Sequence, residues 1–584
     1  MKNWMEIRKG GDFVSLGERF HIDPVIARVM INRGIKEADF ASFLSCKEEY
    51  MHAPSLMLDL EKAVSIILDA VSEKKKIRII GDYDIDGINA TYILYSAFLR
   101  VGADVSYAIP RRIEDGYGIN PMMVEDAHEN GVELIVTCDN GISAFPAVER
   151  AKKLGMTIVV TDHHQVPFEE ENGIKLERLV PADAVVDPHR SKDLYPFKEI
   201  CGGMVAWKLM QLLYEKAGID VHEADDYMEN AAFATVGDIM PLLDENRIVV
   251  KQGLKRMSHT KNVGLRTLIA QNDLEQCALN AYHLGFVLGP CFNASGRLET
   301  ADLAMELLLE KDVMKATQIA GELVSLNSQR KAMTAKGDEM AVSIVEEKEA
   351  LDKVLVLYLP NLHESLCGLV AGHIKEKYYR PTFVLADGDQ CVKGSGRSIE
   401  AYSMFEKMNE CKELLLKFGG HPMAAGLSLE KDNIDAFRRF LNEHCNLSEE
   451  DLKETVYIDV KLPLSYLSEG LIAQLDLLEP FGNKNEKPSF ADKDVSVKKI
   501  TYIGKETKYL KFTFESGNRN IDGLYFGDAM ELEGKIKEAF GTAEYEAALS
   551  GKVNRLKLSV LYYPQINEYR GNRNIQIVVK DVLL

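Results

Sequence analysis

The sequence predicts an α/β protein with a parallel-sheet domain in its N-terminal half and an all-β domain at its C-terminus. Three observations support this prediction. Apolar runs that end in acidic residues or histidines alternate with segments of helical periodicity. Residues 301–345 carry apolar side chains at helical spacing, which predicts a long helix or a helix pair between two domains. From residue 452 onward the chain changes to short alternating runs that are typical of strands.

The alternation in the N-terminal half has the order of a parallel sheet. The candidate strands are 77–80, 132–138, 156–161 and 183–189, and the helical segments after the first two are 89–102 and 143–155. A βαβαβ order places the strands parallel, because each helix returns the chain to the same end of the sheet. Active sites of such sheets lie beyond the carboxyl ends of the strands.

Three carboxylates follow the first candidate strand at alternate positions. Asp82, Asp84 and Asp86 lie in the segment GDYDIDG, and in an extended chain their side chains point to one side. A calcium-binding EF-hand loop also begins D-x-D-x-D-G, but it requires a Glu at position 12, which is Ile93 here. The segment is therefore expected to bind metal outside an EF-hand.

Further metal-type residues follow the next strands. Asp139 comes after the second strand, and Asp162, His163 and His164 come after the third, while Asp238 lies in an apolar, helical stretch. A single Asp after a strand is usually a cap or turn residue, but three clusters after successive strands favour a metal site. Carboxylates with one or two imidazoles suit Mn²⁺ or Mg²⁺, and the number of anionic ligands suits two ions, which together support phosphoester hydrolysis.

The motifs resemble those of a known enzyme family. GDYDIDG, CDNGIS and TDHH are similar in order and spacing to the first three motifs of the DHH phosphoesterase superfamily. Residues 289–302, 363–385, 394–399 and 418–426 resemble further segments of its RecJ exonucleases. The resemblance implies a single-stranded-DNA-specific 5′→3′ exonuclease of recombination and repair that releases 5′-mononucleotides. It also implies a smaller α/β DHHA1 domain after the connecting helix and an OB-fold-like C-terminal domain.

The resemblance also assigns roles to individual residues. The implied metal ligands are Asp82, Asp84, Asp86, Asp139, His163 and Asp238. The implied catalytic residues are Asp139, Asp162 and His164, of which His164 meets the scissile phosphate or completes the metal shell. The implied substrate-binding residues, a pocket for the 5′ end among them, are Arg112, Arg297, His363, Ser395, Arg397, Gly419, Gly420 and His421.

The same interpretation divides the chain into five parts. These are 1–74, a helical N-terminal cap; 75–300, the DHH catalytic domain; 301–345, the connecting helix; 346–451, the DHHA1 substrate-binding domain; and 452–584, the OB-fold-like nucleic-acid-binding domain. Aromatic residues between lysines in the last part, such as Tyr509 and Phe512, suit base stacking, although about half of such aromatics are expected to lie in the core.

Composition limits the partners and the compartment. A net charge of −20 argues against coating of DNA by overall electrostatics, so a nucleic-acid path must be a local groove. Nine cysteines without a C-x-x-C pair, and no apolar segment of a signal peptide, predict reduced thiols in the cytoplasm. No uninterrupted apolar run is long enough for a membrane span.

Two other functions remain open from sequence. One is a DHH phosphodiesterase for short oligonucleotides or cyclic dinucleotides, which the length of the chain disfavours. The other is a non-catalytic DHH scaffold of the replication machinery, which the intact set of acidic residues and His163 disfavours. For the exonuclease, the resemblance implies a monomer that works with a single-strand-binding protein and a RecQ-type helicase.

Overall fold

The computed structural model describes residues 2–112, 114–171, 174–298, 301–347, 350–505, 508–569 and 571–584. The chain forms two compact units. The first, the catalytic unit, contains residues 52–240 and 252–454, and the second, the C-terminal unit, contains residues 3–51, 241–251 and 455–584. Among the described residues, no helix combines the length and the apolar character needed to cross a membrane.

The catalytic unit contains the predicted parallel sheet. Its strands are β2 (Lys76–Ile80), β3 (Asp104–Ala108), β4 (Leu134–Cys138), β5 (Thr157–Thr161) and β8 (Ala184–Val186). They are all parallel, in the order β3-β2-β4-β5-β8, which confirms the predicted α/β class. Every residue of the central strand β4 is buried, as expected for a parallel sheet that helices cover on both faces.

Helices surround this sheet and continue beyond it. Those of the catalytic unit up to residue 298 are α4 (Leu60–Ser72), α5 (Ile85–Arg100), α6 (Pro121–Glu129), α7 (Phe145–Lys153), α8 (Gly202–Ala217), α9 (Met228–Gly237), α11 (Val263–Gln271), the π-helix η5 (His283–Leu288) and α12 (Gly289–Leu298). Helix α10 (Asp244–Met257) begins in the C-terminal unit and ends in the catalytic unit. Helix α5 packs against α8 and α9. The start of α5, the start of α8 and the end of α9 therefore gather near the same edge of the sheet, where the acidic residues lie.

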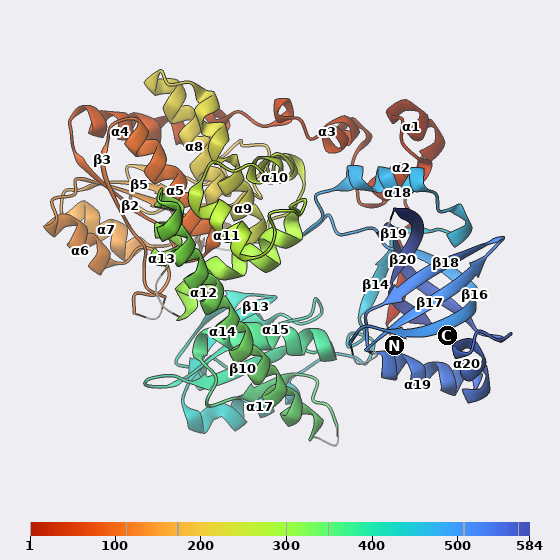
Figure 1. Ribbon diagram of the computed structural model, residues 1–584. Coiled ribbons are helices and arrows are strands. Elements are labelled where there is room, and N and C mark those ends of the chain that lie inside the picture. Colours follow the sequence, from red (N-terminus) through yellow and green to blue (C-terminus); the bar gives the residue numbers. More distant parts are fainter. Residues whose placement is uncertain are drawn as a thin grey trace. The chain divides into compact units, whose positions relative to one another are not determined.

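A helix pair leads to a second α/β domain within the catalytic unit (Figure 1). The pair consists of α13 (Asp302–Leu309) and the long α14 (Val313–Glu346). Asp312 separates them, because its carboxylate caps α14 by accepting a hydrogen bond from the Lys315 amide at 3.0 Å. Of the two forms that the sequence allowed for this stretch, the structure has the pair. The predicted end of the catalytic domain at residue 300 lies outside the described residues.

The second α/β domain is a five-stranded mixed sheet with helices. Its elements are β9 (Leu355–Tyr358), α15 (Cys367–Tyr378), β10 (Thr382–Asp387), β11 (Val392–Arg397), α16 (Met404–Glu410), β12 (Lys417–His421), β13 (Ala424–Leu429) and α17 (Ile434–Glu443). The strand order is β12-β13-β11-β10-β9, and only β9 and β10 are parallel. Buried residues of β11 alternate with partly exposed ones, so Lys393, Ser395 and Arg397 share one face.

The C-terminal unit is strand-rich, as predicted. Its sheet contains β15 (Val460–Lys461), β16 (Phe490–Ile503), β17 (Tyr509–Ser516), β18 (Arg519–Tyr525), β19 (Lys557–Tyr569) and β20 (Asn572–Leu583). Because β16 pairs with both β17 and β19, the strands close into a small barrel of the OB-fold type. The prediction did not include three helices of this region. Helix α18 (Glu469–Leu475) precedes β16 in the chain, and α19 (Ala529–Phe540) and α20 (Thr542–Leu549) lie between β18 and β19. Phe512 and Phe514 belong to the core of this unit.

The N-terminal segment differs from the predicted cap on the first domain. Strand β1 (Asn3–Glu6) pairs with β14 (Thr455–Ile458), and helices α1 (Phe13–Phe20), α2 (Pro24–Asn32) and α3 (Phe40–Ser45) contribute to the core of the C-terminal unit. The sequence predicted helices correctly here, but an amphipathic helix does not specify which distant partner covers its apolar face. Of the predicted cap, α4 belongs to the catalytic unit. The exact domain boundaries remain predictions.

One buried arginine joins three distant segments of the C-terminal unit. Arg247 donates from Nε to the Phe43 carbonyl at 3.0 Å, from Nη1 to the Leu478 carbonyl at 2.8 Å and from Nη2 to the Leu477 carbonyl at 2.8 Å. Its guanidinium also lies 3.9 Å from the centre of the Phe43 ring. Burial lowers the pKa of Arg247 to about 10, which leaves it charged at neutral pH.

We predict that Arg247→Met destabilises the C-terminal unit by about 3 kcal/mol or more, because three buried carbonyls lose their donor and each costs about 1–3 kcal/mol when unpaired. The matched control is Arg8→Met, since the Arg8 side chain is 71% exposed and its partner Glu6 keeps an ion pair with Lys461 at 2.9 Å; a change within about 1 kcal/mol is expected. Chemical unfolding of the full chain measures both variants. Equal unfolding midpoints for the two would contradict the role given to Arg247.

Candidate active site

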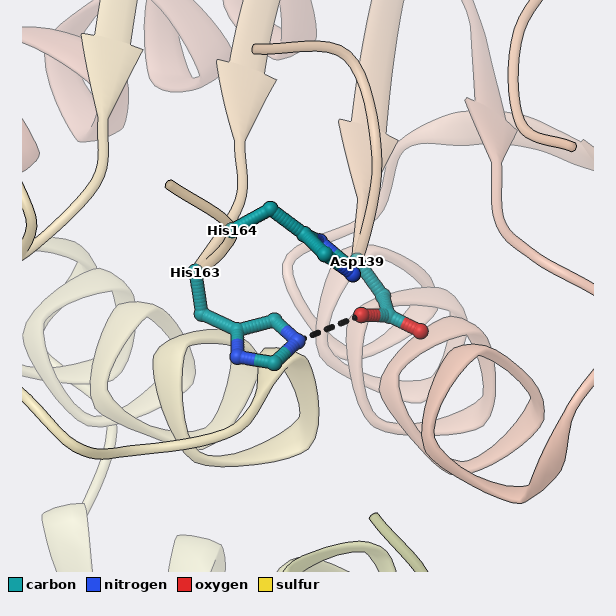
Figure 2. A group of neighbouring side chains, drawn as sticks. All are labelled: Asp139, His163 and His164. Carbon is teal, nitrogen blue, oxygen red and sulfur yellow. Dashed lines mark hydrogen bonds and ion pairs between the residues drawn. The ribbon is translucent and has the colours of Figure 1, made fainter. Parts of the chain in front are cut away.

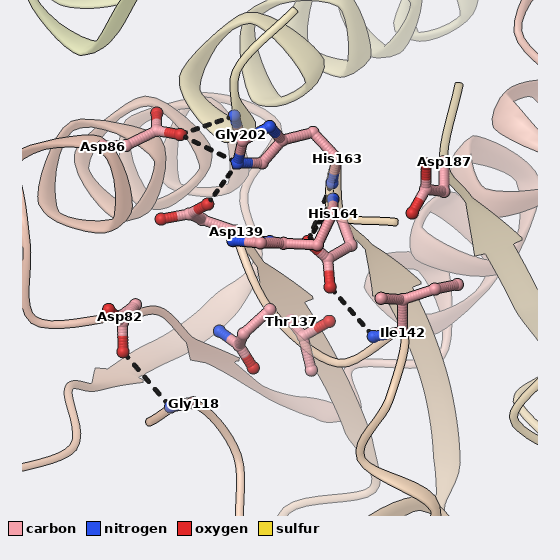
Figure 3. A network of polar contacts seen from close by, with 12 residues as sticks. Asp82, Asp86, Gly118, Thr137, Asp139, Ile142, His163, His164, Asp187 and Gly202 are labelled. Atoms are coloured by element: carbon pink, nitrogen blue, oxygen red, sulfur yellow. Dashed lines mark hydrogen bonds and ion pairs between the residues drawn. The ribbon is translucent and has the colours of Figure 1, made fainter. Parts of the chain in front are cut away.

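The functional residues collect where three neighbouring strands end. Strand β2 pairs with β4, and β4 pairs with β5, so Asp82, Asp139 and Asp162 follow adjacent strands at one edge of the sheet. Figure 3 shows Asp82 and Asp139 beyond the strand ends, together with Asp86. Asp139 adopts a left-handed backbone conformation with φ of 62°, which is uncommon outside glycine and is frequent at functional sites.

Three groups of side chains have the spacing of metal ligands. In each group the candidate donor atoms lie within 4.8 Å of one another. The first group is Asp82, Asp84 and Asp139. The second is Asp86, His163 and Asp238, and the third is Asp139, His163 and His164. Asp139 and His163 each belong to two groups. Their side chains are in direct contact, with Asp139 Oδ1 2.9 Å from His163 Nε2 (Figure 2). Overlapping groups of this kind suit two neighbouring cations that share a ligand.

The strand-to-helix turn after β2 brings its three carboxylates together in a way that the sequence did not predict. Asp84 is the N-cap of α5, and its Oδ1 accepts hydrogen bonds from the amides of Asp86 at 2.9 Å and Gly87 at 3.1 Å. Asp86 therefore lies in the first helical turn and not in an extended segment. A Cβ on Gly87 would lie 2.6 Å from the Asp82 amide nitrogen, so only glycine permits this tight turn.

The N-terminus of α8 holds Asp86 in place. The Gly202 and Gly203 amides donate to Asp86 Oδ2 and Oδ1, each at 2.7 Å. A helix N-terminus stabilises an anion, because its first amides lack partners within the helix and carry positive charge. Both positions require glycine because a side chain would have no space. A Cβ on Gly202 would lie 2.5 Å from the Cβ of Asp139, and a Cβ on Gly203 would lie 2.5 Å from the Cβ of Ala234.

Burial of so many carboxylates changes how they titrate. Burial, followed by neighbouring carboxylates, raises the pKa values of Asp82 and Asp139 well above their usual range. The same causes raise the pKa of Asp238 to about 8. Asp82 Oδ2 is buried and accepts no hydrogen bond from the described residues. Divalent cations would neutralise this repulsion, and carboxylates with imidazole are donors that Mn²⁺ and Mg²⁺ accept, so these residues fit such ions.

Asp162, which is predicted to be catalytic, is held by contacts within the protein. Its Oδ1 lies 2.7 Å from His164 Nδ1, and its Oδ2 accepts a hydrogen bond from the Ile142 amide at 2.9 Å. Burial favours the protonated form, but these partners hold the pKa of Asp162 below its ordinary value. Both oxygens are thus occupied within the protein, and Asp162 belongs to none of the three groups. It is placed to orient His164.

His164 lies at the opening of the site, with its side chain 43% exposed. Burial disfavours its charged form, but the hydrogen bond to Asp162 and the surrounding carboxylates raise its pKa to about 9. The Tyr117 hydroxyl donates to the Asp139 carbonyl at 2.7 Å and lies 3.1 Å from His164 Nε2. The same hydroxyl lies 3.3 Å from His164 Nδ1, so it contacts the ring at similar distances from both nitrogens. Asp162 thus holds His164 through Nδ1, and Tyr117 packs against the ring.

A second cluster in the catalytic unit consists of arginines. Arg297, at the end of α12, donates from Nη1 to the Ser365 carbonyl at 2.6 Å. Burial lowers its pKa to about 10, and the neighbouring charges of Arg112, Arg330 and Arg397 add to this effect. Arg112 also lies over the Tyr83 ring at 5.0 Å. Among the described residues, no ion pair joins these four arginines to a carboxylate, so the cluster has the charge of an anion-binding site.

The remaining predicted substrate residues lie on the second α/β domain. In the strand register Ser395 and Gly419 are both paired with Gly426, and Arg397 and His421 are both paired with Ala424. These side chains therefore share a face of the sheet, on which Arg397 connects them to the arginine cluster.

Gly420 and His363 have supporting positions. Gly420 has φ of 139°, and a Cβ there would lie 2.4 Å from the Ala424 carbonyl oxygen, so this position of β12 requires glycine. His363 Nδ1 lies 2.7 Å from Ser365 Oγ, and the Ser365 carbonyl is the acceptor for Arg297. His363 is therefore linked to the arginine cluster through Ser365.

Sequence reasoning missed several residues of the site. Tyr117, Gly202, Gly203 and Arg330 were not singled out, although each contacts or adjoins predicted residues. The pair of glycines before a helical segment was a usable signal, because a glycine-rich helix start binds anions. Tyr117 and Arg330 carried no such signal, since their roles depend on contacts with residues distant in sequence.

Comparisons with known proteins agree with this geometry. Family models match the DHH family N-terminal domain at residues 76–235, the DHHA1 domain at 351–447 and the RecJ OB domain at 458–581. Among solved structures, RecJ of Thermus thermophilus in complex with Mn²⁺ has a TM-score of 0.81 and 25% sequence identity, covering 100% of this chain and 79% of that one. The same protein in complex with Mg²⁺ gives a TM-score of 0.76.

Sequence relatives agree over most of the chain. The single-stranded-DNA-specific exonuclease RecJ of Bacillus subtilis is 32% identical over 572 residues, which are 97% of this chain and 69% of the relative. The protein of that name from Escherichia coli is 31% identical over 585 residues, covering 96% of each chain. On these matches, the chain belongs to the RecJ family of single-stranded-DNA-specific exonucleases.

Proposed function

We propose that this chain is a metal-dependent exonuclease that hydrolyses single-stranded DNA from its 5′ end and releases 5′-mononucleotides. The observation that carries the proposal is the pair of sites in one unit: overlapping donor groups for two Mn²⁺ or Mg²⁺ ions, and a cluster of four arginines. The exonuclease activity named for its RecJ relatives supports the same conclusion.

Different residues would bind the metal ions and contact the reacting phosphate. Asp82, Asp84 and Asp139 would hold one ion, and Asp86, His163 and Asp238 would hold the other, with Asp139 in contact with both groups. When bound, the ions supply an activated water and positive charge for the reacting phosphate. His164, held through Nδ1 by Asp162, would donate a hydrogen bond from Nε2 to a phosphate oxygen as negative charge develops there.

The arginine cluster accounts for action at an end of the strand. A terminal phosphate carries more charge than an internal one, and several guanidinium groups recognise it better than single lysines do. Ser395, Gly419 and His421, on the sheet face that Arg397 shares, add a hydroxyl, an accessible amide and an imidazole. We assign the 5′ phosphate to this cluster. Binding of the 5′ phosphate there would position the first phosphodiester bond at the metal ligands.

The proposal extends to the setting of the enzyme. We propose a cytoplasmic monomer in recombination and repair, acting with a single-strand-binding protein and a RecQ-type helicase. The net charge of −20 supports the proposal of such partners. DNA repels a chain of this charge, so proteins that bring single strands to the enzyme would aid substrate binding. The single-stranded substrate named for the RecJ relatives supports it as well.

We predict that Asp139→Asn lowers exonuclease turnover by about 1,000-fold or more, because a shared metal ligand stabilises the transition state by several kcal/mol. The measurement is release of nucleotides from 5′-labelled and 3′-labelled single strands with Mn²⁺ or EDTA. The matched control is Asp187→Asn, a buried Asp after the neighbouring strand β8 that lies outside the three donor groups; it should retain activity within about tenfold.

Three outcomes of that assay would contradict the proposal. Equal losses of exonuclease turnover in the two variants would show that Asp139 has no special role. Turnover of dinucleotides alone would indicate a short-oligonucleotide phosphodiesterase, and no metal-dependent turnover of any substrate by the unaltered chain would indicate a scaffold protein.

We predict that Arg112→Ala raises KM for 5′-phosphorylated strands by about 10- to 100-fold, since a charge-assisted hydrogen bond contributes about 1.5–3 kcal/mol. Strands with a 5′ hydroxyl should show little difference between the variant and the unaltered chain. Arg111→Ala is the matched control, because Arg111 is exposed and pairs with Glu114 at 2.8 Å. An equal effect on both kinds of 5′ end would exclude Arg112 from the end pocket.

A further inference from the structure

Two buried asparagines form a hydrogen bond with each other between helices α5 and α9. Asn89 and Asn230 are 0% and 1% exposed, and Asn230 Nδ2 donates to Asn89 Oδ1 at 2.9 Å. Asn89 Nδ2 in turn donates to the Ile85 carbonyl at 2.7 Å. A buried amide costs free energy unless its partners are in place, so we expect such a pair where an interface requires a directional contact. We call Asn89 and Asn230 the amide pair.

Both helices of the amide pair carry candidate metal ligands. Asp86 lies in the first turn of α5, before Asn89, and Asp238 directly follows α9. These two carboxylates belong to the second donor group, together with His163 from the segment after β5. The separation of Asp86 and Asp238 therefore depends on how α9 lies against α5.

Close packing brings the two helices together where the ligands lie. A Cβ on Gly237, next to Asp238, would lie 2.3 Å from Ile85 Cγ2. Ile85 stands between the ligands Asp84 and Asp86 in the chain. Because Gly237 has no side chain, the end of α9 rests directly on the segment that carries two ligands. The same Ile85 residue is held through its carbonyl by the amide pair.

Several small apolar side chains lie on the buried surface of α9. They are Ala231, Ala232 and Ala234. Such side chains let helices approach closely, but apolar contacts are not directional and do not by themselves specify how one helix is placed along another. A hydrogen bond between two amides requires a defined distance and angle. In coiled coils, a single buried Asn specifies the register of neighbouring helices at a cost in stability.

We propose that the amide pair fixes the position of α9 along α5 and thereby places Asp238 at the distance from Asp86 that the second metal ion requires. Asn89 and Asn230 are positioning residues, because they act through the two helices and not through a bond to the ion. This inference rests on the proposed function and names residues that support one of its two metal groups. Metal sites need such support, because their ligands must be held within a fraction of an ångström.

The first donor group provides an internal reference for this proposal. It consists of Asp82, Asp84 and Asp139 and contains no residue of α9. Substitution of residues that support a metal ligand typically lowers metal affinity about 10- to 100-fold. A change in the amide pair should therefore weaken the second ion and spare the first, whereas a general loss of stability would weaken both.

The test measures the Mn²⁺ affinity of each donor group separately in the full chain. Asp82→Asn leaves the second donor group intact, and Asp238→Asn leaves the first intact, so each background reports one ion. Free Mn²⁺ is followed by electron paramagnetic resonance in both backgrounds, with and without Asn230→Leu. Asn442→Leu is the matched control, because Asn442 donates to the Val354 carbonyl at 2.9 Å and accepts from the Val354 amide at 3.1 Å in the second α/β domain.

We expect Asn230→Leu to weaken Mn²⁺ binding about 10- to 100-fold in the Asp82→Asn background and less than about threefold in the Asp238→Asn background. Asn442→Leu should change neither affinity by more than about threefold.

A double variant separates positioning from stability. Asn230→Leu leaves Asn89 buried without its partner, which lowers stability, whereas Asn89→Leu together with Asn230→Leu removes both amides. We expect the double variant to recover stability in chemical unfolding, relative to Asn230→Leu alone. Its Mn²⁺ affinity in the Asp82→Asn background should stay low, because apolar contacts do not replace the directional one.

Three results would overturn the inference. The first is unchanged Mn²⁺ affinity when Asn230→Leu is added to the Asp82→Asn background. The second is an equal loss of affinity in both backgrounds, which would mean that the amide pair supports the fold as a whole. The third is full affinity in the double variant, which would mean that apolar packing alone positions Asp238. Failure of the proposed function would be seen separately, as absence of saturable Mn²⁺ binding by the chain without substitutions.

Discussion

Buried negative charge beyond the ends of β2, β4 and β5 is the constraint on which the catalytic unit depends. Ionised carboxylates in a poorly solvated site repel one another, and burial together with this repulsion raises the pKa values of Asp82, Asp84 and Asp139. A fold that keeps such a cluster must supply opposing positive charge. The helix N-terminus at Gly202 and Gly203 supplies part of it, and divalent cations supply the remainder.

The surrounding structure holds this cluster because the protein backbone approaches the carboxylates closely. Gly87, Gly202 and Gly203 stand where any Cβ would overlap a neighbour, so the turn after β2 and the start of α8 reach the carboxylates directly. Asp162 and Tyr117 then fix His164 at the opening. The arrangement is preorganised because contacts within the protein hold the ligand side chains, which lowers the cost of ordering them during the reaction.

Much of this site could be predicted from the sequence because it depends on local order. Strand ends in a parallel sheet meet at one edge, so the positions of Asp82, Asp139 and His163 followed from the alternation of strands and helices. The role of Asp162 could not be predicted, since it depends on which of two adjacent histidines its carboxylate reaches. The placement of residues 3–51 in the C-terminal unit could not be predicted either, because their apolar faces indicate burial but do not indicate the partner.

Titration of the full chain with Mn²⁺, followed by electron paramagnetic resonance, tests whether the buried carboxylates bind cations. We expect two bound Mn²⁺ ions per chain with magnetic coupling between them, because the donor groups overlap at Asp139 and His163. Asp139→Asn should abolish the coupling. Two independent, uncoupled ions, or no saturable binding, would contradict this expectation.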